Sequence, residues 1–251
     1  MNLKHTLKQN KLTIGSWITI GHPSVAEILC SAGFDWLTID LEHSPIDLET
    51  AQTLIALIQG KGLKALVRVG KNEEVIIKRV MDAGADGVIV PMINSRQDAE
   101  QAVSFTKYPP AGKRGVGLAR AQRYGTGFDA YKRWLEEEAI VIAQIEHVQA
   151  VDNIEEIIAV PGIDGTIIGP YDLSGSLGIA GQLDHPLLQE KVKAVEAACK
   201  KQNFPLGYHV IQSDHKKMLE KIREGYTFLA FSLDFFFLGD KAREEMRMIR
   251  S

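Results

Sequence analysis

The residues with the clearest capacity for chemistry follow one apolar segment, which leads into Asp40, Glu42 and His43. Two carboxylates and an imidazole within four residues can hold a cation, bind a ligand or move a proton. If this segment is one of several parallel strands in a barrel, its exit meets the exits of the other strands at one mouth. Polar groups also stand at or beyond the ends of later apolar segments: Arg68, Gln144, Glu146 and Asp172.

These residues have more than one interpretation. Glu146 and Asp172 are a candidate metal pair, because Mg²⁺ and Mn²⁺ prefer oxygen ligands and often take only one or two protein carboxylates. Each acid alone could equally be a surface group or a helix cap. Arg68 closes an apolar segment, where a charge is costly unless paired, so a structural acid or an anionic ligand must face it. His43 could be a general base, a metal ligand or an ordinary loop histidine.

Short apolar segments alternate with longer amphipathic ones along the chain, which is typical of strand–helix units around a parallel sheet. Eight such units in 251 residues predict an α/β fold, a TIM (β/α)8 barrel that forms a single domain over residues 1–251. The expected strands are Leu12–Ile18, Trp36–Asp40, Leu63–Val69, Gly87–Met92, Ile140–Glu146, Gly162–Ile168, Pro205–Val210 and Thr227–Leu233.

The connections predict which end of the barrel carries the site. Expected helices include Glu73–Ala83, Ser95–Thr106, Val148–Val160 and Pro186–Lys201, with Ser95 and Asp184 as caps. Glycines that end helices just before a strand are Gly33, Gly84, Gly162 and Gly225. Two longer insertions, Lys107–Ala139 and Gly169–His185, are expected after the carboxyl ends of strands, where barrel enzymes carry their working loops.

Composition excludes several classes of partner. The net charge of −3 offers no excess of Lys and Arg for nucleic acid or an anionic membrane. No apolar run approaches the ~20 residues that span a bilayer, and the N-terminus lacks an apolar signal segment, so we expect a soluble, cytoplasmic protein. Cys30 and Cys199 are interpreted as packing thiols. A small molecule is the expected partner.

Six segments carry a resemblance to a known family: Ile39–His43, Val67–Arg68, Val90–Met92, Tyr108–Gly117, Gln144–Glu146 and Ile168–Ser174. In order and spacing they resemble the HpcH/HpaI family of class II pyruvate aldolases, and the likeness runs from about Gly15 to Asp234. The resemblance implies a TIM barrel and a carbon–carbon lyase that uses a divalent cation (Mg²⁺, Mn²⁺ or Co²⁺). The substrate would be a 4-hydroxy-2-oxo acid, such as a 2-keto-3-deoxy sugar acid or 4-hydroxy-2-oxoheptanedioate, cleaved to pyruvate and an aldehyde.

The resemblance also implies roles for individual residues. Glu146 and Asp172 would bind the cation, Arg68 would steady the enolate oxygen, His43 paired with Asp82 would be the acid/base, and Asp40 would assist proton transfer. Gln144 and Tyr171 are expected to contact the substrate together with Arg68 and Asp172. Tyr171 stands where many members have alanine, and His147 where a small hydroxyl residue is common, so the aldehyde partner is left open.

Arg120 and Arg123 could receive the distal carboxylate or hydroxyls of the aldehyde, or could belong to a solvated basic loop. Three consecutive phenylalanines, Phe235 to Phe237, predict a subunit contact. The resemblance implies a homo-hexamer built from dimers that exchange the last helix. Two alternatives to an aldolase stay open: a condensing, citrate-synthase-like enzyme of the same superfamily, and a barrel that binds an oxo acid without turnover.

Overall fold

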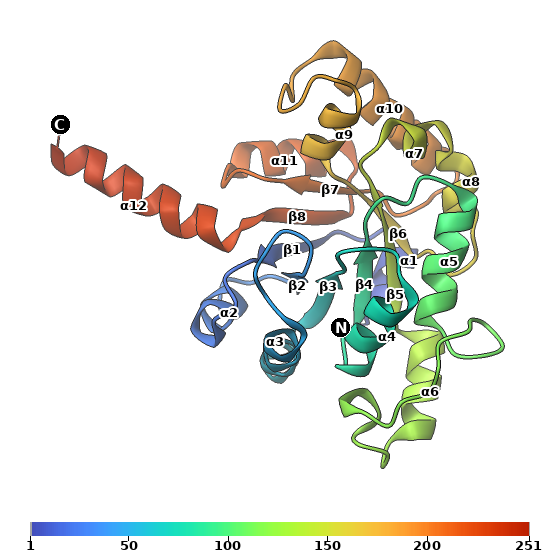
Figure 1. The fold of residues 1–251 in the computed structure, drawn as a ribbon. Coiled ribbons are helices and arrows are strands. Elements are labelled where there is room, and N and C mark those ends of the chain that lie inside the picture. The colour runs from blue at the N-terminus through green and yellow to red at the C-terminus, as the bar shows by residue number, and fades with distance from the viewer. Residues whose placement is uncertain (1, 251) are drawn as a thin grey trace.

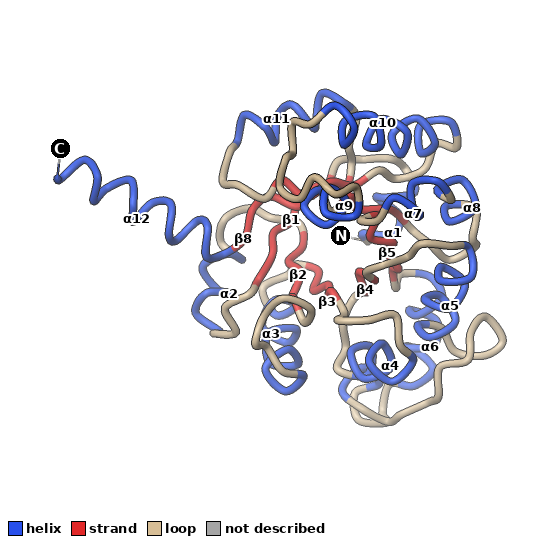
Figure 2. The backbone as a smooth tube through the Cα atoms, turned by 45° about the horizontal axis from the view of Figure 1, so that its top comes forward, coloured by secondary structure: helices blue, strands red, loops and turns tan. Residues whose placement is uncertain are grey.

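Eight parallel strands close into a barrel in the computed structural model of the protein, which describes residues 2–250 (Figures 1 and 2). Each strand pairs with the next along the chain, and β8 pairs with β1. The strands are β1 Thr13–Ile18, β2 Trp36–Asp40, β3 Lys64–Arg68, β4 Gly87–Val90, β5 Ile140–Ile145, β6 Gly165–Ile168, β7 Gly207–Val210 and β8 Phe228–Leu233. The TIM-barrel prediction is confirmed, although the expected range 1–251 includes Met1 and Ser251, which lie outside the described residues.

All eight expected strands are present within their expected bounds. The largest difference is in β6, which begins at Gly165 and not at Gly162. Gly162 has φ +102° and ends the turn before the strand, because this left-handed conformation favours glycine and stops a helix. Gly33, Gly84 and Gly225 also have positive φ, between +90° and +97°. The expected helix-ending glycines are therefore confirmed.

The helices surround the barrel, and the last one leaves it (Figure 2). They are α1 Leu3–Lys8, α2 Pro23–Cys30, α3 Leu48–Gly60, α4 Glu74–Asp82, α5 Arg96–Thr106, α6 Phe128–Glu137, α7 Val148–Asp152, α8 Ile154–Ile158, α9 Pro170–Ser176, α10 Pro186–Lys201, α11 His215–Glu224 and α12 Asp234–Arg250, with a 3₁₀ turn, η1, at Arg120–Gln122. In Figure 1, α12 projects away from the body of the molecule.

Two details of the expected helices are wrong. The segment Val148–Val160 is not one helix, because Asn153 ends α7 and precedes α8 while its side chain donates to the carbonyl of Asn94 at 2.8 Å. The cap of α10 is His185 and not Asp184: Pro186 occupies the first turn, and His185 Nδ1 accepts from the N–H of Leu187 at 3.2 Å. The Ser95 cap of α5 is confirmed by its bond from the N–H of Asp98.

The placement of the first insertion is also wrong. Lys107–Ala139 follows α5 and leads into the amino end of β5, so it does not follow the carboxyl end of a strand. The second insertion, Gly169–His185, does follow the carboxyl end of β6. In Figure 1, α9 of the second insertion and α6 of the first lie at opposite ends of the molecule. Only the second insertion can therefore reach the mouth of its own barrel.

The core has two layers. Side chains inside the barrel, among them Trp17, Trp36 and Phe228, pack with Leu3 and Leu7 of α1, while the outer faces of the strands pack against the surrounding helices. Strands that are buried on both faces are typical of a parallel sheet enclosed by helices. Within residues 2–250, no helix is long and apolar enough to cross a membrane.

The three phenylalanines at the start of α12 are only partly covered. Phe235 is exposed, Phe236 packs partly against the interior of the barrel, and Phe237 packs partly against Phe34 and Phe231. Farther along the projecting helix, Leu238, Met246 and Ile249 are 45–73% exposed.

Candidate active site

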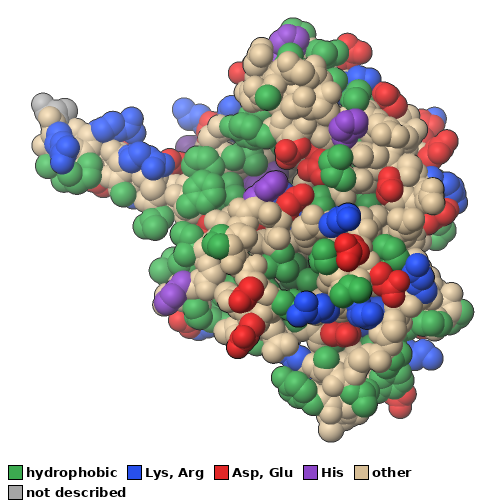
Figure 3. Space-filling model, viewed as in Figure 1, with side chains coloured by type: hydrophobic (Ala, Val, Ile, Leu, Met, Phe, Trp, Pro, Cys, Tyr) green, Lys and Arg blue, Asp and Glu red, His purple; other side chains and the backbone are tan. Residues whose placement is uncertain are grey.

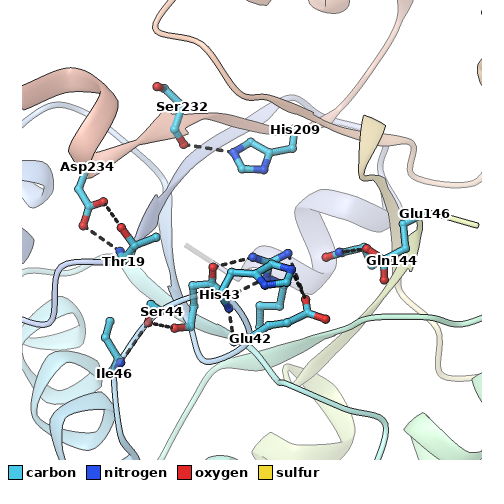
Figure 4. Close-up of polar contacts among 12 residues, drawn as sticks. Thr19, Glu42, His43, Ser44, Ile46, Gln144, Glu146, His209, Ser232 and Asp234 are labelled. Carbon is cyan, nitrogen blue, oxygen red and sulfur yellow. Dashed lines mark hydrogen bonds and ion pairs between the residues drawn. The ribbon is translucent and has the colours of Figure 1, made fainter. Parts of the chain in front are cut away.

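A cavity of about 240 Å³ opens at the carboxyl ends of the strands. Most of the polar residues expected at the strand exits line it, together with Tyr171, Trp17 and His209: Asp40, His43, Arg68, Gln144 and Asp172. Glu42 and Glu146 are not part of this lining. Figure 3 shows acidic and histidine side chains gathered around a hollow on the face seen in Figure 1. In Figure 4, Glu42 and His43 lie on one side of the site, Gln144 and Glu146 face them, and His209 lies above.

Arg68 is held at this mouth by two acids. Asp40 lies opposite it in the β2–β3 register and accepts from its Nε at 2.9 Å and its Nη2 at 2.5 Å. Glu42 Oε2 lies 3.1 Å from Nη1. Burial opposes ionisation of Asp40, but the hydrogen bonds and charge of Arg68 hold the pKa of this carboxyl below its usual value. The paired acid that a buried guanidinium requires is therefore Asp40.

The turn after β2 presents His43 to solvent. Asp40 Oδ1 also accepts from the backbone N–H groups of Glu42 at 3.0 Å and His43 at 3.3 Å, and Ser44 Oγ donates to the Asp40 carbonyl at 2.5 Å. The His43 side chain is 63% exposed, with Nε2 3.9 Å from Glu42 Oε2. The imidazole is thus placed at the rim by the same aspartate that fixes Arg68.

Glu146 lies deeper in the mouth. Its Oε1 accepts from the backbone N–H of Met92 at 2.7 Å, and its Oε2 accepts from the side chain of Gln144. Burial raises the pKa of Glu146, and the nearby Asp172 adds to the rise. A Cβ on Gly169 would lie 3.3 Å from the Cβ of Glu146, so the turn that leads to Asp172 packs directly on this acid.

The electrostatics of the mouth fit a bound cation. Four carboxylates, on Asp40, Glu42, Glu146 and Asp172, face the single guanidinium of Arg68. Burial raises the pKa of Glu42 to about 7, and repulsion from the other three acids adds to it while Arg68 opposes it. Of these four, Glu146 and Asp172 are the two carboxylates that are not hydrogen-bonded to Arg68 or ion-paired with it. They can act as oxygen ligands, and a hard cation can complete such a site with water and substrate oxygens.

No preformed cluster of three or more His, Cys, Asp or Glu ligands exists within residues 2–250. A cation held at Glu146 and Asp172 would therefore take most of its ligands from outside the chain. This donor set suits Mg²⁺ or Mn²⁺ better than Zn²⁺, which prefers nitrogen and sulfur ligands.

The expected His43–Asp82 pair does not form within the chain. Asp82 is the last residue of α4, which runs from the carboxyl end of β3 back toward the amino end of β4, whereas His43 stands at the carboxyl end of β2. Asp82 Oδ1 lies 4.0 Å from Nη2 of the buried Arg114. Burial raises the pKa of Asp82 although Arg114 opposes the rise.

Arg120 and Arg123 are not brought to the mouth of their own chain either. Arg120 donates to the carbonyl of Ala83 and to Gln59, each at 3.0 Å, close to the amino end of β4. Both arginines line a separate cavity with Asp86 and Trp134, because their insertion lies at the amino end of the barrel. That cavity is the larger of the two, at about 610 Å³, but it contains none of the strand-exit groups.

Several groups at the mouth are not predicted by the sequence analysis. His209 on β7 and Trp17 on β1 line the mouth, and the Met92 N–H orients Glu146. His209 could have been found, because it is an imidazole near the end of an expected strand. The Met92 contact has no sequence signal, because a backbone group depends on φ, which is +54° here. His147 serves as the cap of α7.

Comparisons with known proteins show the family of the chain. The model of the HpcH/HpaI aldolase/citrate lyase family matches residues 13–239. The chain belongs to this family. It is 37% identical over 239 residues to a 2-dehydro-3,6-dideoxy-6-sulfogluconate aldolase of Pseudomonas putida, covering 95% of this chain and 92% of that one.

Two further relatives extend the comparison. A 5-keto-4-deoxy-D-glucarate aldolase of Klebsiella pneumoniae subsp. pneumoniae is 37% identical over 233 residues, covering 92% of this chain and 90% of that one. The solved structure of an HpcH/HpaI family protein from Burkholderia cenocepacia J2315 has a TM-score of 0.94 at 34% identity and covers 100% of both chains. The expected family and the expected lyase class are confirmed.

Proposed function

We propose that this HpcH/HpaI protein is a metal-dependent aldolase that reversibly cleaves a 4-hydroxy-2-oxo acid to pyruvate and an aldehyde. The observation that carries the proposal is the convergence of Arg68, Glu146 and Asp172 at one mouth. The names of the two curated relatives, both aldolases of keto-deoxy sugar acids, support a sugar-acid substrate.

The residues of the mouth match the charge changes of retro-aldol cleavage. Cleavage leaves negative charge on the former 2-oxo oxygen, and a divalent cation held by Glu146 and Asp172 would supply Lewis-acid stabilisation of that charge. Because Asp40 already occupies Nε and Nη2, Arg68 would contact the same oxygen through Nη1, whose two hydrogens can serve both Glu42, 3.1 Å away, and the substrate. A preorganised donor of this kind stabilises the enolate more than the ground state, which is the source of rate.

His43 is the proposed acid/base. The 4-hydroxyl proton must leave as the carbon–carbon bond breaks, and an imidazole titrates near neutral pH, where it can accept this proton and return it to the departing enolate. Its exposed position at the rim leaves it free to approach the 4-hydroxyl group. Asp40 is fixed to Arg68 in an ionised state, which favours a positioning role for this aspartate.

The described lining of the mouth contains no lysine. A Schiff-base mechanism would require a lysine amine within reach of the 2-oxo carbon. The chain's own residues therefore favour stabilisation of the enolate oxygen by charge.

We also propose a homo-oligomer, with the hexamer as the expected form. Asp82, Arg120 and Arg123 lie toward the amino ends of the strands, so they can act only on the mouth of a neighbouring copy. The exposed apolar side chains of α12 offer a surface for such a copy.

The test is cleavage of 2-keto-3-deoxy sugar acids and of 4-hydroxy-2-oxoheptanedioate, followed by coupled detection of pyruvate. The expected result is release of pyruvate. This activity should be lost when a chelator is added and restored by Mn²⁺, Co²⁺ or Mg²⁺, and borohydride should not trap the substrate on the protein. Borohydride trapping would overturn the mechanism. Product from oxaloacetate and an acyl donor would favour the condensing alternative, and thermal stabilisation by pyruvate or oxalate without turnover would favour the binding barrel.

A further inference from the structure

His209 is a buried polar residue of the mouth to which the proposed function gives no role. It lies on β7, is 7% exposed and lines the cavity beside Trp17 and Ile211. Buried polar groups in proteins are nearly always hydrogen-bonded. Each nitrogen of this ring therefore needs a partner, in the protein, in water or in a ligand.

The ring has a fixed orientation and a fixed tautomer. It stacks on Trp17 with the ring centroids 4.5 Å apart and an interplanar angle of 27°. Nε2 lies 3.2 Å from the carbonyl oxygen of Ser232, and because a carbonyl oxygen only accepts, Nε2 must carry the hydrogen. Burial lowers the pKa of His209 to about 4, so the ring is neutral at pH 7 and its Nδ1 has a free lone pair.

Nδ1 has no hydrogen-bond partner within the described part of the chain. In Figure 4 this nitrogen faces the centre of the mouth, toward His43 and Glu42, while the other nitrogen is bonded to Ser232. The lone pair is therefore presented to the space that a substrate would fill.

His209 lies close to the group that would hold the oxo acid. The guanidinium carbon of Arg68 lies 5.7 Å from the centroid of the Trp17 ring, on which His209 stacks. A ligand whose oxo-acid end contacts Arg68 therefore has His209 within reach across the Trp17 ring. The neighbouring wall of Ile211, Leu233 and Phe236 is apolar and offers a substrate hydroxyl no polar side-chain atom, whereas the hydroxyl groups of Thr19 and Tyr171 belong to other parts of the lining.

We propose that Nδ1 of His209 accepts a hydrogen bond from a hydroxyl group of the aldehyde portion of the substrate, so that the enzyme prefers hydroxylated aldehydes over their deoxy analogues. The inference rests on the proposed function and adds a substrate class to it. A neutral acceptor does not attract a carboxylate or sulfonate, which has no hydrogen to donate. A site that hydrogen-bonds a hydroxyl discriminates against an analogue that lacks it, because the acceptor is then left unpaired.

The test compares glycolaldehyde with acetaldehyde as acceptors for pyruvate, with Mn²⁺ present. In His209→Leu, kcat/KM for glycolaldehyde should fall about tenfold while that for acetaldehyde stays within about twofold, as expected for the loss of one hydrogen bond to a buried acceptor. His209→Asn places a side-chain oxygen near the position of Nδ1 and should retain most of the preference.

Tyr208→Phe is the matched control, because Tyr208 lies on the same strand but does not line the mouth cavity; its preference should equal that of the unmodified protein. If His209→Leu fails to fold, His209→Gln, which keeps a donor toward Ser232, takes its place. An unchanged preference in the folded variant, or an equal fall for both aldehydes, overturns the inference. Absence of product from the unmodified protein with both aldehydes counts against the proposed function instead.

Discussion

Arg68 and Asp40 form a two-bond ion pair at the mouth of the barrel, with distances of 2.9 and 2.5 Å between their nitrogen and oxygen atoms. The two residues are direct neighbours in the β2–β3 register, so the sheet itself sets their geometry. The pair occupies Nε and Nη2 of the guanidinium. Nη1 faces Glu42 Oε2 at 3.1 Å, and its second hydrogen is available to an anion. A rigid donor of this kind is what a developing oxyanion requires.

Arg68→Lys should lower kcat about 10²–10³-fold, comparable to the loss of one oxyanion donor. Lysine keeps the charge but lacks the planar fork that holds Asp40 and a substrate oxygen together. Steady-state cleavage kinetics measure the effect. A variant with normal kcat and only a raised KM would contradict a role for Arg68 in the transition state.

Asp40→Asn separates positioning from proton transfer. Because the charge and hydrogen bonds of Arg68 keep the pKa of Asp40 low against the effect of burial, this group stays ionised above its ordinary pKa of about 3.9. The variant should lose kcat by about tenfold or more through misplacement of Arg68, with the shape of the pH–rate profile unchanged. If the variant instead lost one of the two sloping sides of the pH–rate profile between about pH 5 and 9, Asp40 would be supported as a proton-transfer group.

Glu146→Gln and Asp172→Asn should each weaken Mn²⁺ binding by at least about tenfold, because each removes one of only two protein carboxylates proposed as ligands. Isothermal titration with the purified protein measures the affinity. Glu155→Gln is the matched control, because Glu155 lies on α8 in an exposed ion pair with Lys201. Equal Mn²⁺ affinities in all four proteins would rule out this pair as the cation site.

A mixing experiment tests whether neighbouring copies complete one another's sites. His43→Ala and Asp82→Ala should each be nearly inactive alone. Mixed oligomers formed by co-refolding should recover roughly a quarter of the activity if Asp82 serves the mouth of a neighbouring chain, because random pairing then yields some intact sites. If mixed oligomers of the correct size recover no activity, Asp82 has a structural role beside Arg114 and does not serve a neighbouring mouth.

The buried amine of Lys107, at the amino end of the barrel, should make the free energy of unfolding depend on pH. Its Nζ donates to the carbonyls of Leu135 and Ala139, and burial, reinforced by Lys4, lowers its pKa to about 7. In the unfolded chain a lysine titrates near ~10.4. Between these values the unfolded chain binds more protons, so the free energy of unfolding rises with pH.

Lys107→Met should remove this rise, which amounts to a few kcal/mol because each pKa unit corresponds to about 1.4 kcal/mol. Urea unfolding of both proteins near pH 7 and pH 9.5 measures the difference. Parallel pH dependences in the two proteins would show that Lys107 does not carry the effect.

The architecture could be predicted from the sequence because its signals are local. Strand-length apolar segments and glycines such as Gly84 and Gly225, which end helices at positive φ, locate the units without knowledge of tertiary contacts. The strand-exit acids follow from the same pattern, since parallel strands in a barrel deliver their ends to one mouth. The convergence of Asp40, Arg68 and Asp172 was accessible in this way.

The sequence shows which end of the barrel an insertion occupies only if the element before it is recognised. An insertion after a strand lies at the carboxyl ends, and one after a helix lies at the amino ends. The sequence pattern alone predicts Lys107–Ala139 at the mouth, whereas this insertion follows α5 and so lies at the amino ends of the strands. For the same reason, Arg120 and Asp82 lie away from the mouth of their own chain, and the role of each stays a prediction about a neighbouring copy. Contacts made through backbone groups, such as the Met92 N–H with Glu146, depend on tertiary geometry that no residue pattern encodes.

Exchange of the methyl hydrogens of pyruvate with deuterium, followed by proton NMR, tests the central claim most directly, because it reports enolate formation without any aldehyde. We expect exchange that requires Mn²⁺ or Mg²⁺ and stops when a chelator is added. Exchange should be lost in Arg68→Lys and in the Glu146→Gln/Asp172→Asn double variant but not in Glu155→Gln. Exchange that continues at the same rate in the double variant or after removal of the cation would contradict this claim.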